Sequence, residues 1–219
     1  MIQGHTQKIY EALKASVDQK KSASFIVSGG SSPIKIFNEL SNSDLDWNKI
    51  NIALVDERVV KTTRNDSNEN MLRKQLLINN AAKANYISLL DEPKKVLAIK
   101  KPFDVVLLGM GEDGHFASLF TDHIVNNPMD VDHKIRPNII YTKPMGDPLY
   151  ERVSMNLSMI LRASKIFLLV SNERKLNVLE KSVTDNSFPV FYLLNQNKVN
   201  IEILGGDSVS YTHLRAHET

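Results

Sequence analysis

Apolar residues follow two spacings along the chain, and the spacing changes from one segment to the next. Ile9, Leu13 and Val17 recur at the spacing of one helix face, which predicts an amphipathic helix over residues 6–19. Short continuous apolar runs bounded by polar turns predict strands. These runs cover residues 23–27, 50–55, 86–89, 103–108, 139–142, 152–157, 165–170 and 199–204.

Segments with helical spacing separate most of these runs. Helices are expected after Pro33, after a capping Ser67, and near residues 93–99, 158–163 and 173–182, and an apolar segment at 190–194 precedes the last strand. Strands that alternate with helices are typical of βαβ units. The sequence therefore predicts a single α/β domain, with a mostly parallel central sheet and helices on both faces.

Composition narrows the class of protein. The 219 residues are 42% hydrophobic and 24% charged, the ordinary balance of a folded domain. A formal net charge of +2 without a basic run argues against a nucleic-acid partner. The absence of cysteine excludes disulfides, thiolate metal ligands and a cysteine nucleophile. No apolar run approaches the ~20 residues of a membrane span, and the polar start is unlike a signal peptide, so we expect a cytoplasmic protein with no membrane partner.

Polar clusters stand where several of the predicted strands end. Residues 28–32 follow the first strand, 56–58 the second, 109–115 the fourth and 171–175 a later one. In a parallel sheet the carboxyl ends of the strands share one edge, where ligands bind. We therefore expect these clusters to converge on a single site.

The first cluster reads SGGSSP and joins a strand to a helix. Gly29 and Gly30 allow a tight turn with exposed N–H groups, and Ser31 and Ser32 add hydroxyl donors. Together with the helix N-terminus, this combination favours a phosphate. The loop has no P-loop lysine, so a nucleoside triphosphate is not indicated. The alternative is an ordinary turn whose serines cap the helix.

Cations are the second feature of the expected site. Arg58, in the tripeptide Asp56-Glu57-Arg58, suits bidentate recognition of a phosphate or carboxylate, and the alternative is an ion pair that orders the loop. Arg152, at the start of a predicted strand, and Lys175, in a strand-to-helix turn, can face the same edge. The alternative for both is a solvated surface charge.

The sharpest cluster reads GMGEDGH at residues 109–115. Its glycines have the spacing of a dinucleotide-binding turn, but the cluster lies in mid-chain and no acid ends the next strand. Asp113 instead places a carboxylate near His115. A neutral imidazole accepts protons near neutral pH, so His115 is a candidate general base. The alternative is a loop histidine that caps the following helix.

Other motifs for hydrolysis or metal binding are lacking. His123 and His133 lie on polar loop positions, and their spacing from His115 matches no familiar metal motif. No G-x-S-x-G elbow is present for a serine nucleophile. We therefore expect neither a metal nor a cofactor.

Taken in order, six segments resemble the 6-phosphogluconolactonase family, and together they span about residues 6–204. They read SGGSSP, VDERVV, DSNENM, FDVVLLGMGEDGHFASLF, RVSMNLS and SNERK. The resemblance implies a Rossmann-like fold and cofactor-free hydrolysis of 6-phospho-D-glucono-1,5-lactone to 6-phosphogluconate, in the oxidative pentose phosphate pathway. The partner is then this small molecule, and the chain is expected to be a monomer or weak homodimer.

The resemblance also implies roles for individual residues. His115 would be the general base that activates water, and Asp113 would orient its imidazole. The substrate would be bound by Gly29, Gly30, Ser31, Ser32, Asp56, Arg58, Gly111, Arg152 and Lys175. Four positions depart from the family's pattern: Phe116 stands where threonine is more usual, beside the expected pocket, Thr121 where proline is common, Ser32 where threonine is usual, and Asn172 where glycine is common.

Two alternative functions use the same fold. A glucosamine-6-phosphate deaminase or isomerase would use Asp56 as the enolising base, but that branch follows its histidine with residues other than those at 116–120. A non-catalytic sugar-phosphate sensor would keep the pocket without the chemistry, and the presence of Asp113 and His115 favours an enzyme.

The last residues differ from the rest of the chain. The segment GGDSVSYTHLRAHET follows the last predicted strand and has no core pattern. We therefore expect the domain to span residues 1–206, with residues 207–219 as a disordered or non-native extension.

Overall fold

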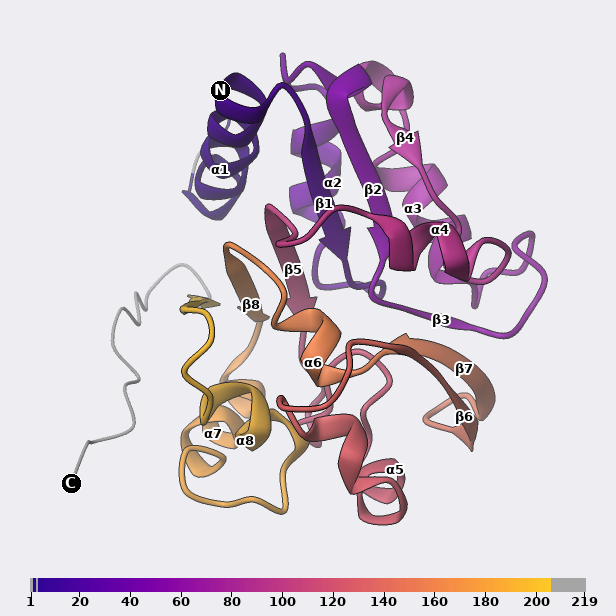
Figure 1. Ribbon diagram of the computed structural model, residues 1–219, viewed down its shortest axis with the longest axis vertical. Coiled ribbons are helices and arrows are strands. Elements are labelled where there is room, and N and C mark those ends of the chain that lie inside the picture. Colours follow the sequence, from indigo (N-terminus) through magenta and orange to yellow (C-terminus); the bar gives the residue numbers. More distant parts are fainter. Residues whose placement is uncertain (1, 3, 206–219) are drawn as a thin grey trace.

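A computed structural model of the chain describes residue 2 and residues 4–205. Its centre is a six-stranded parallel sheet with the order β4-β2-β1-β5-β8-β9 (Figure 1). The strands are β1 (Ala23–Val27), β2 (Ile50–Leu54), β4 (Asn85–Tyr86), β5 (Val105–Gly109), β8 (Ile166–Val170) and β9 (Ile201–Gly205). The predicted single α/β domain with a mostly parallel sheet is confirmed. The extension expected at 207–219 lies outside the described residues.

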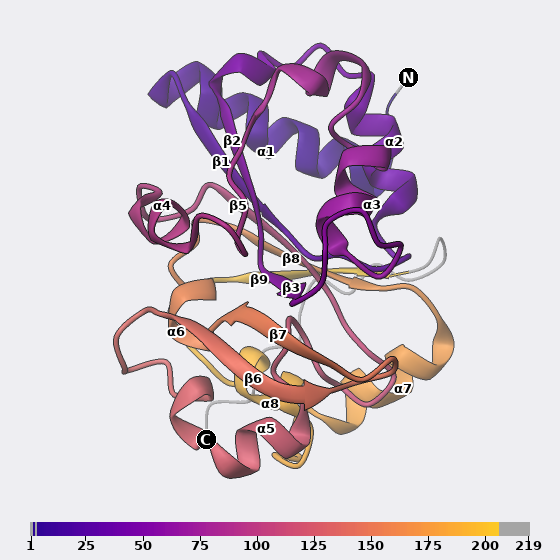
Figure 2. The ribbon, with the colours of Figure 1, turned by 90° about the vertical axis from the view of Figure 1, so that its right-hand side faces the viewer.

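Helices flank this sheet (Figures 1 and 2). They are α1 (Gly4–Lys20), α2 (Ile34–Ser41), α3 (Asn68–Gln75), α4 (Pro93–Ala98), α5 (Thr121–Asn126), α6 (Leu157–Ile160), α7 (Glu173–Lys181) and α8 (Pro189–Leu194), with short 3₁₀ turns η1 (Trp47–Lys49), η2 (Asn79–Lys83) and η3 (Pro128–Val131). The stripe Ile9, Leu13 and Val17 of α1 is buried, as its spacing predicts. Ser67 caps α3, and its Oγ accepts a hydrogen bond from Asn70 N at 3.1 Å.

A second, antiparallel sheet was not predicted from the sequence. It has the order β3-β7-β6, formed by β3 (Asp56–Arg58), β7 (Tyr150–Met155) and β6 (Ile139–Met145). Figure 1 shows this sheet beyond the carboxyl ends of β1 and β2. Residues 56–58, expected as a polar strand end, pair with β7 because the chain continues extended out of β2. Arg152 consequently lies inside a strand and not at its start.

The backbone of one residue, Val55, is hydrogen-bonded to both sheets. Val55 N donates to the Val27 carbonyl of β1 at 2.8 Å, and the Val55 carbonyl accepts from Met155 N of β7 at 2.9 Å. Val55 therefore belongs to the hydrogen-bond pattern of both sheets and fixes where β3 begins.

The core lies between the central sheet and its helices. Every residue of β1 and β8 is buried, as expected for central parallel strands covered on both faces. His123 is also buried, contrary to its expected loop position: it lies in α5, and its Nε2 is 2.7 Å from Asp130 Oδ2. Among the described residues, no helix is long and apolar enough to cross a membrane.

Candidate active site

The segment after β5 folds into a tight loop that carries His115. Gly111 N donates to the His115 carbonyl at 2.8 Å, and Gly114, with a φ of +80°, adopts a conformation that costs a glycine little. Phe116 is fully buried. Its ring therefore anchors the loop in the core, and the departure from the family's usual threonine does not change the wall of an accessible pocket.

Asp113 fixes the orientation of the imidazole. Its Oδ1 lies 2.5 Å from His115 Nδ1 and accepts from His115 N at 3.2 Å. The pairing places the proton of the neutral imidazole on Nδ1 and leaves the lone pair on Nε2. Burial works to raise the pKa of Asp113, but the hydrogen bond and charge of His115 outweigh it, and that pKa is lowered. Nε2 is therefore the atom able to accept a proton.

Gly111 makes room for this pair. A Cβ on Gly111 would lie 2.3 Å from His115 Nδ1 and 2.4 Å from Asp113 Oδ1. Any side chain at position 111 would therefore displace the imidazole or the carboxylate. The glycine spacing that resembles a dinucleotide-binding turn has a different physical reason here, which is the close approach of two side chains.

One aromatic ring contacts both His115 and an arginine. The rings of Phe120 and His115 are stacked, with centroids 4.1 Å apart and planes inclined by 24°. The guanidinium carbon of Arg152 lies 5.0 Å from the centroid of the same Phe120 ring. The sequence interpretation named Phe120 only as part of a motif and gave it no role of its own.

The small sheet places two arginines beside each other. Arg58 and Arg152 are direct partners in the β3–β7 register, so their side chains leave the same face. Asp56 lies on that face as well, because side chains alternate along a strand. Burial lowers the pKa of Arg152, Asp56 acts to raise it, and Arg58 lowers it further. In the described part of the chain, neither arginine belongs to a salt bridge, so this face suits an anion.

Ser118 connects the His115 loop to this face. Ser118 Oγ donates to Asp56 Oδ2 at 2.7 Å, and Ser118 N donates to Ser154 Oγ of β7 at 3.2 Å. All three side chains are buried. The position of the imidazole relative to the arginines is therefore set by hydrogen bonds between distant segments.

The glycine–serine loop lies against Asn68, a residue that the sequence interpretation did not select. A Cβ on Gly29 would lie 2.1 Å from Asn68 Oδ1, and Asn68 Nδ2 donates to the Asp56 carbonyl at 3.0 Å. Gly30 has a φ of +83°, which favours glycine. Ser31 is exposed, and its carbonyl accepts from the backbone at the start of α2. Asn68 thus holds this loop next to β3.

Lys175 reaches the same loop from α7. Its Nζ donates to Ser32 Oγ at 3.2 Å, and Ser32 Oγ lies 3.3 Å from Ser171 Oγ. Burial lowers the pKa of Lys175, and the charge of Glu112 acts in the opposite direction. Asn172, at the position where the family usually has glycine, has extended backbone and caps α7 by accepting from Lys175 N at 2.9 Å.

A buried carboxylate holds two of these elements in place. Glu57 Oε1 accepts from Arg58 N at 2.7 Å and from Asn68 N at 2.8 Å. Glu57 Oε2 accepts from Glu69 N at 2.7 Å and from Ser67 Oγ at 3.0 Å. An anion at the N-terminus of α3 is favourable for the helix dipole. Glu57 therefore fixes the start of α3, and with it Asn68, to β3.

The predicted site residues form three groups joined by these contacts. Gly111, Asp113 and His115 share one loop, Asp56, Arg58 and Arg152 share one face of the small sheet, and Gly29, Gly30, Ser32 and Lys175 lie around the first loop. Ser118 and Asn68 link the groups through Asp56. Sequence reasoning missed four contributors, although the quoted segments DSNENM, VDERVV and FASLF contain them: Glu57, Asn68, Ser118 and Phe120.

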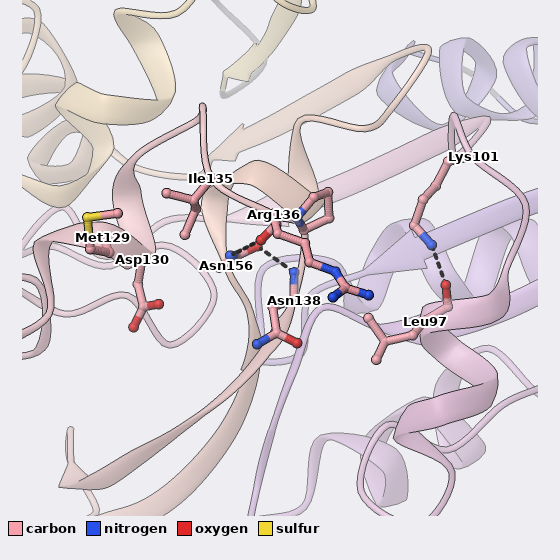
Figure 3. A pocket seen from close by; sticks show the side chains of 9 residues that line it. Leu97, Lys101, Met129, Asp130, Ile135, Arg136, Asn138 and Asn156 are labelled. Atoms are coloured by element: carbon pink, nitrogen blue, oxygen red, sulfur yellow. Dashed lines mark hydrogen bonds between the residues drawn. The ribbon is translucent and has the colours of Figure 1, made fainter.

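A separate cavity of about 680 Å³ contains none of these residues (Figure 3). It is lined by Leu97, Lys101, Met129, Asp130, Ile135, Arg136, Pro137, Asn138 and Asn156. Two of its polar side chains make hydrogen bonds within the protein: Lys101 Nζ donates to the Leu97 carbonyl at 2.5 Å, and Asn156 Nδ2 donates to the Arg136 carbonyl at 3.1 Å. In the described residues, no group of three or more His, Asp or Glu side chains is placed to hold a metal ion.

The fold and site define an α/β protein with an acid–base pair and a group of cations at the carboxyl edge of a parallel sheet. Residues 1–201 match the family model of glucosamine-6-phosphate isomerases/6-phosphogluconolactonase. The chain belongs to this family.

Relatives of known name cover nearly the whole chain. The 6-phosphogluconolactonase of Helicobacter pylori is 36% identical over 215 residues, covering 90% of this chain and 90% of its own. That of Neisseria meningitidis is 35% identical, covering 89% and 90%. The crystal structure of a 6-phosphogluconolactonase from Shewanella baltica superposes with a TM-score of 0.82 at 31% identity, covering 92% of this chain and 91% of that one.

Proposed function

We propose that this protein hydrolyses 6-phospho-D-glucono-1,5-lactone to 6-phosphogluconate, a step of the oxidative pentose phosphate pathway. The observation that carries the proposal is the Asp113–His115 pair, with Nε2 free to accept a proton beside a face that bears Arg58 and Arg152. The names of the relatives give the substrate class.

The proposed reaction needs one base. His115 Nε2 removes a proton from water as the water oxygen attacks the lactone carbonyl carbon, and a tetrahedral oxyanion forms. When the oxyanion collapses, the bond between this carbon and the ring oxygen breaks. The imidazolium returns its proton to the ring oxygen, which becomes a hydroxyl group, and the new carboxylic acid loses its proton to solvent. Asp113 holds the imidazole in the tautomer that this cycle requires.

Cations bind the two anionic parts of the reacting substrate. Lys175 and the loop that contains Gly29, Gly30 and Ser32 bind the phosphate, because an ammonium, hydroxyls and backbone N–H groups meet there. Arg58 and Arg152 supply positive charge for the phosphate and for the oxyanion that develops next to His115. The negative charge of Asp56 acts to raise the pKa of Arg152 and so favours its charged form.

The isomerase or deaminase alternative assigns a different role to Asp56. Enolisation would require its carboxylate to take a proton from carbon, whereas the Asp56 side chain is buried and accepts a hydrogen bond from Ser118. This hydrogen bond favours a structural role for Asp56 over a role as a base. It therefore favours the lactonase reaction, in which Asp56 is not the base.

The deciding experiment measures hydrolysis of freshly generated 6-phosphogluconolactone, corrected for spontaneous opening of the ring, with glucosamine 6-phosphate as the alternative substrate. We expect rapid loss of lactone and no release of ammonia. Release of ammonia without lactone hydrolysis would overturn the proposal. The same assay with a chelator tests the expected independence from metal.

The proposed location is the cytoplasm, and the proposed assembly is a monomer or weak homodimer. Light scattering over a range of protein concentrations tests the assembly, and a stable higher oligomer would contradict it.

A further inference from the structure

We propose that Phe120 is a positioning residue: its ring is a spacer that keeps Arg152 away from the lone pair of His115 while holding both in the site. The inference rests on the proposed hydrolysis. The His115 imidazole stacks on the Phe120 ring, with 4.1 Å between the two ring centroids. The guanidinium carbon of Arg152 lies 5.0 Å from the centroid of the same Phe120 ring.

The ring contacts two groups that could form a hydrogen bond with each other. A guanidinium has five N–H donors and no acceptor, and Nε2 of the neutral His115 imidazole is an acceptor. A direct contact would occupy the lone pair that must receive the proton from water. It would also bring a fixed positive charge next to an imidazole that becomes positive during the reaction, and like charges at short range oppose each other. The apolar ring prevents both effects.

Phe120 differs from a core aromatic. Phe116, four residues earlier, is fully buried in the hydrophobic core, whereas Phe120 is only partly buried and lies outside the core cluster. Its ring contacts the His115 imidazole and the Arg152 guanidinium. A role in the site therefore explains its position better than packing does.

The turn between β6 and β7 supports the spacer from the other side. A Cβ on Gly146, whose φ is +82°, would lie 2.4 Å from Arg152 Nη2 and 3.1 Å from Phe120 Cζ. Arg152 Nε donates to the Met145 carbonyl at 3.2 Å. The turn thus packs against both the guanidinium and the ring, and Arg152 has little freedom to move while the ring is present.

The test compares Phe120→Leu, Phe120→Tyr and the control Phe191→Leu. Phe191 is partly buried and packs edge-on against Tyr192. We expect Phe120→Leu to lower kcat about 10–100-fold with KM changed by less than about threefold, because the base is disturbed more than substrate binding. The acidic limb of its kcat/KM profile moves to lower pH by about one unit, because Arg152 approaches the imidazole. Phe120→Tyr, which keeps the ring, stays within about threefold of wild type in kcat.

A double variant tests whether the effect of Phe120→Leu comes from the approach of Arg152 to His115 or from a general loss of packing. In Phe120→Leu with Arg152→Met no cation remains to approach His115, so we expect the acidic limb to return to its wild-type position. An NMR titration of the His115 imidazole in the same four variants gives this readout without turnover. The inference is wrong, although the function stands, if Phe120→Leu matches Phe191→Leu in kcat, in the pH profile of kcat/KM and in the NMR titration of His115. If the wild-type protein lacks lactonase activity, the proposed function fails and the NMR titration alone decides whether Phe120 is a spacer.

Discussion

Ser118 and Asp56 lie 62 positions apart in the chain and are joined by a hydrogen bond of 2.7 Å between buried side chains. One residue belongs to the loop that presents His115, and the other to the strand that presents Arg58. The bond therefore fixes the distance between the proposed base and the cations.

Removal of the Ser118 hydroxyl tests this bond. Because Ser118→Ala leaves a buried carboxylate without a donor, we expect the free energy of unfolding to fall by about 1–3 kcal/mol in urea titrations. Ser22→Ala, at an exposed serine, serves as the control and is expected to stay within about 0.5 kcal/mol of wild type. Equal stability of the two variants would show that the bond contributes nothing.

Removal of the proposed base is expected to lower turnover without loss of the fold. His115→Ala should reduce kcat by about 10²–10⁴-fold, the usual contribution of a positioned general base. His133→Ala, at a histidine outside the site, is the control. Steady-state kinetics on fresh lactone measure turnover, and circular dichroism checks that the fold is retained. Near-wild-type turnover in His115→Ala would remove this residue from the mechanism.

A methyl group at position 111 is expected to lower activity by steric displacement of the His115 imidazole. Gly111→Ala places a Cβ 2.3 Å from His115 Nδ1, so the imidazole must move, and a displacement of about 1 Å lowers kcat about 100-fold.

Gly109→Ala is the matched control for this variant. The nearest atom to its Cβ is Ser28 Cβ at 4.0 Å, so the methyl group fits. Activity is measured for both variants, together with the His115 imidazole signals in NMR spectra. A similar loss of kcat in both would point to a general effect on the loop and against the close approach at Gly111.

The affinity for phosphate is expected to depend on the protonation of Lys175. Burial lowers the pKa of this ammonium below its usual value. Only the protonated form attracts the phosphate, so binding of 6-phosphogluconate should weaken as pH rises, and at a lower pH than that expected for an ordinary lysine at about 10.4.

Calorimetric titrations of the product from pH 7 upward measure this effect. Lys175→Arg keeps its charge throughout that range, so its affinity should not fall over the same pH interval, whatever its absolute value. A parallel decline in both proteins would show that another group is responsible.

The parallel sheet was predictable from the sequence because all of its strands except the two-residue β4 coincide with local apolar runs. The small sheet was not. β3 consists of the polar residues Asp56, Glu57 and Arg58, and its partner β7 lies far along the chain, so no local periodicity marks the pairing. The same pairing buries Arg152, for which sequence reasoning left a surface position open.

The acid–base pair was predictable because Asp113 and His115 are neighbours in the sequence. Phe120 and Asn68 were not, because their importance comes from contacts with segments distant in sequence, Arg152 in one case and Gly29 in the other. The role of Gly111 was also hidden, since a glycine that makes room for a side chain looks in the sequence like one that turns the backbone.

Because Val55 is hydrogen-bonded to both sheets, the length of the link between the sheets is as important as its residues. Strand side chains alternate faces, so one inserted residue between Leu54 and Asp56 would turn Asp56 and Arg58 to the opposite side of the small sheet. The parallel sheet would persist while the cationic face lost half of its charge. Chain length at this junction is therefore a determinant of the site that is separate from the identity of its residues.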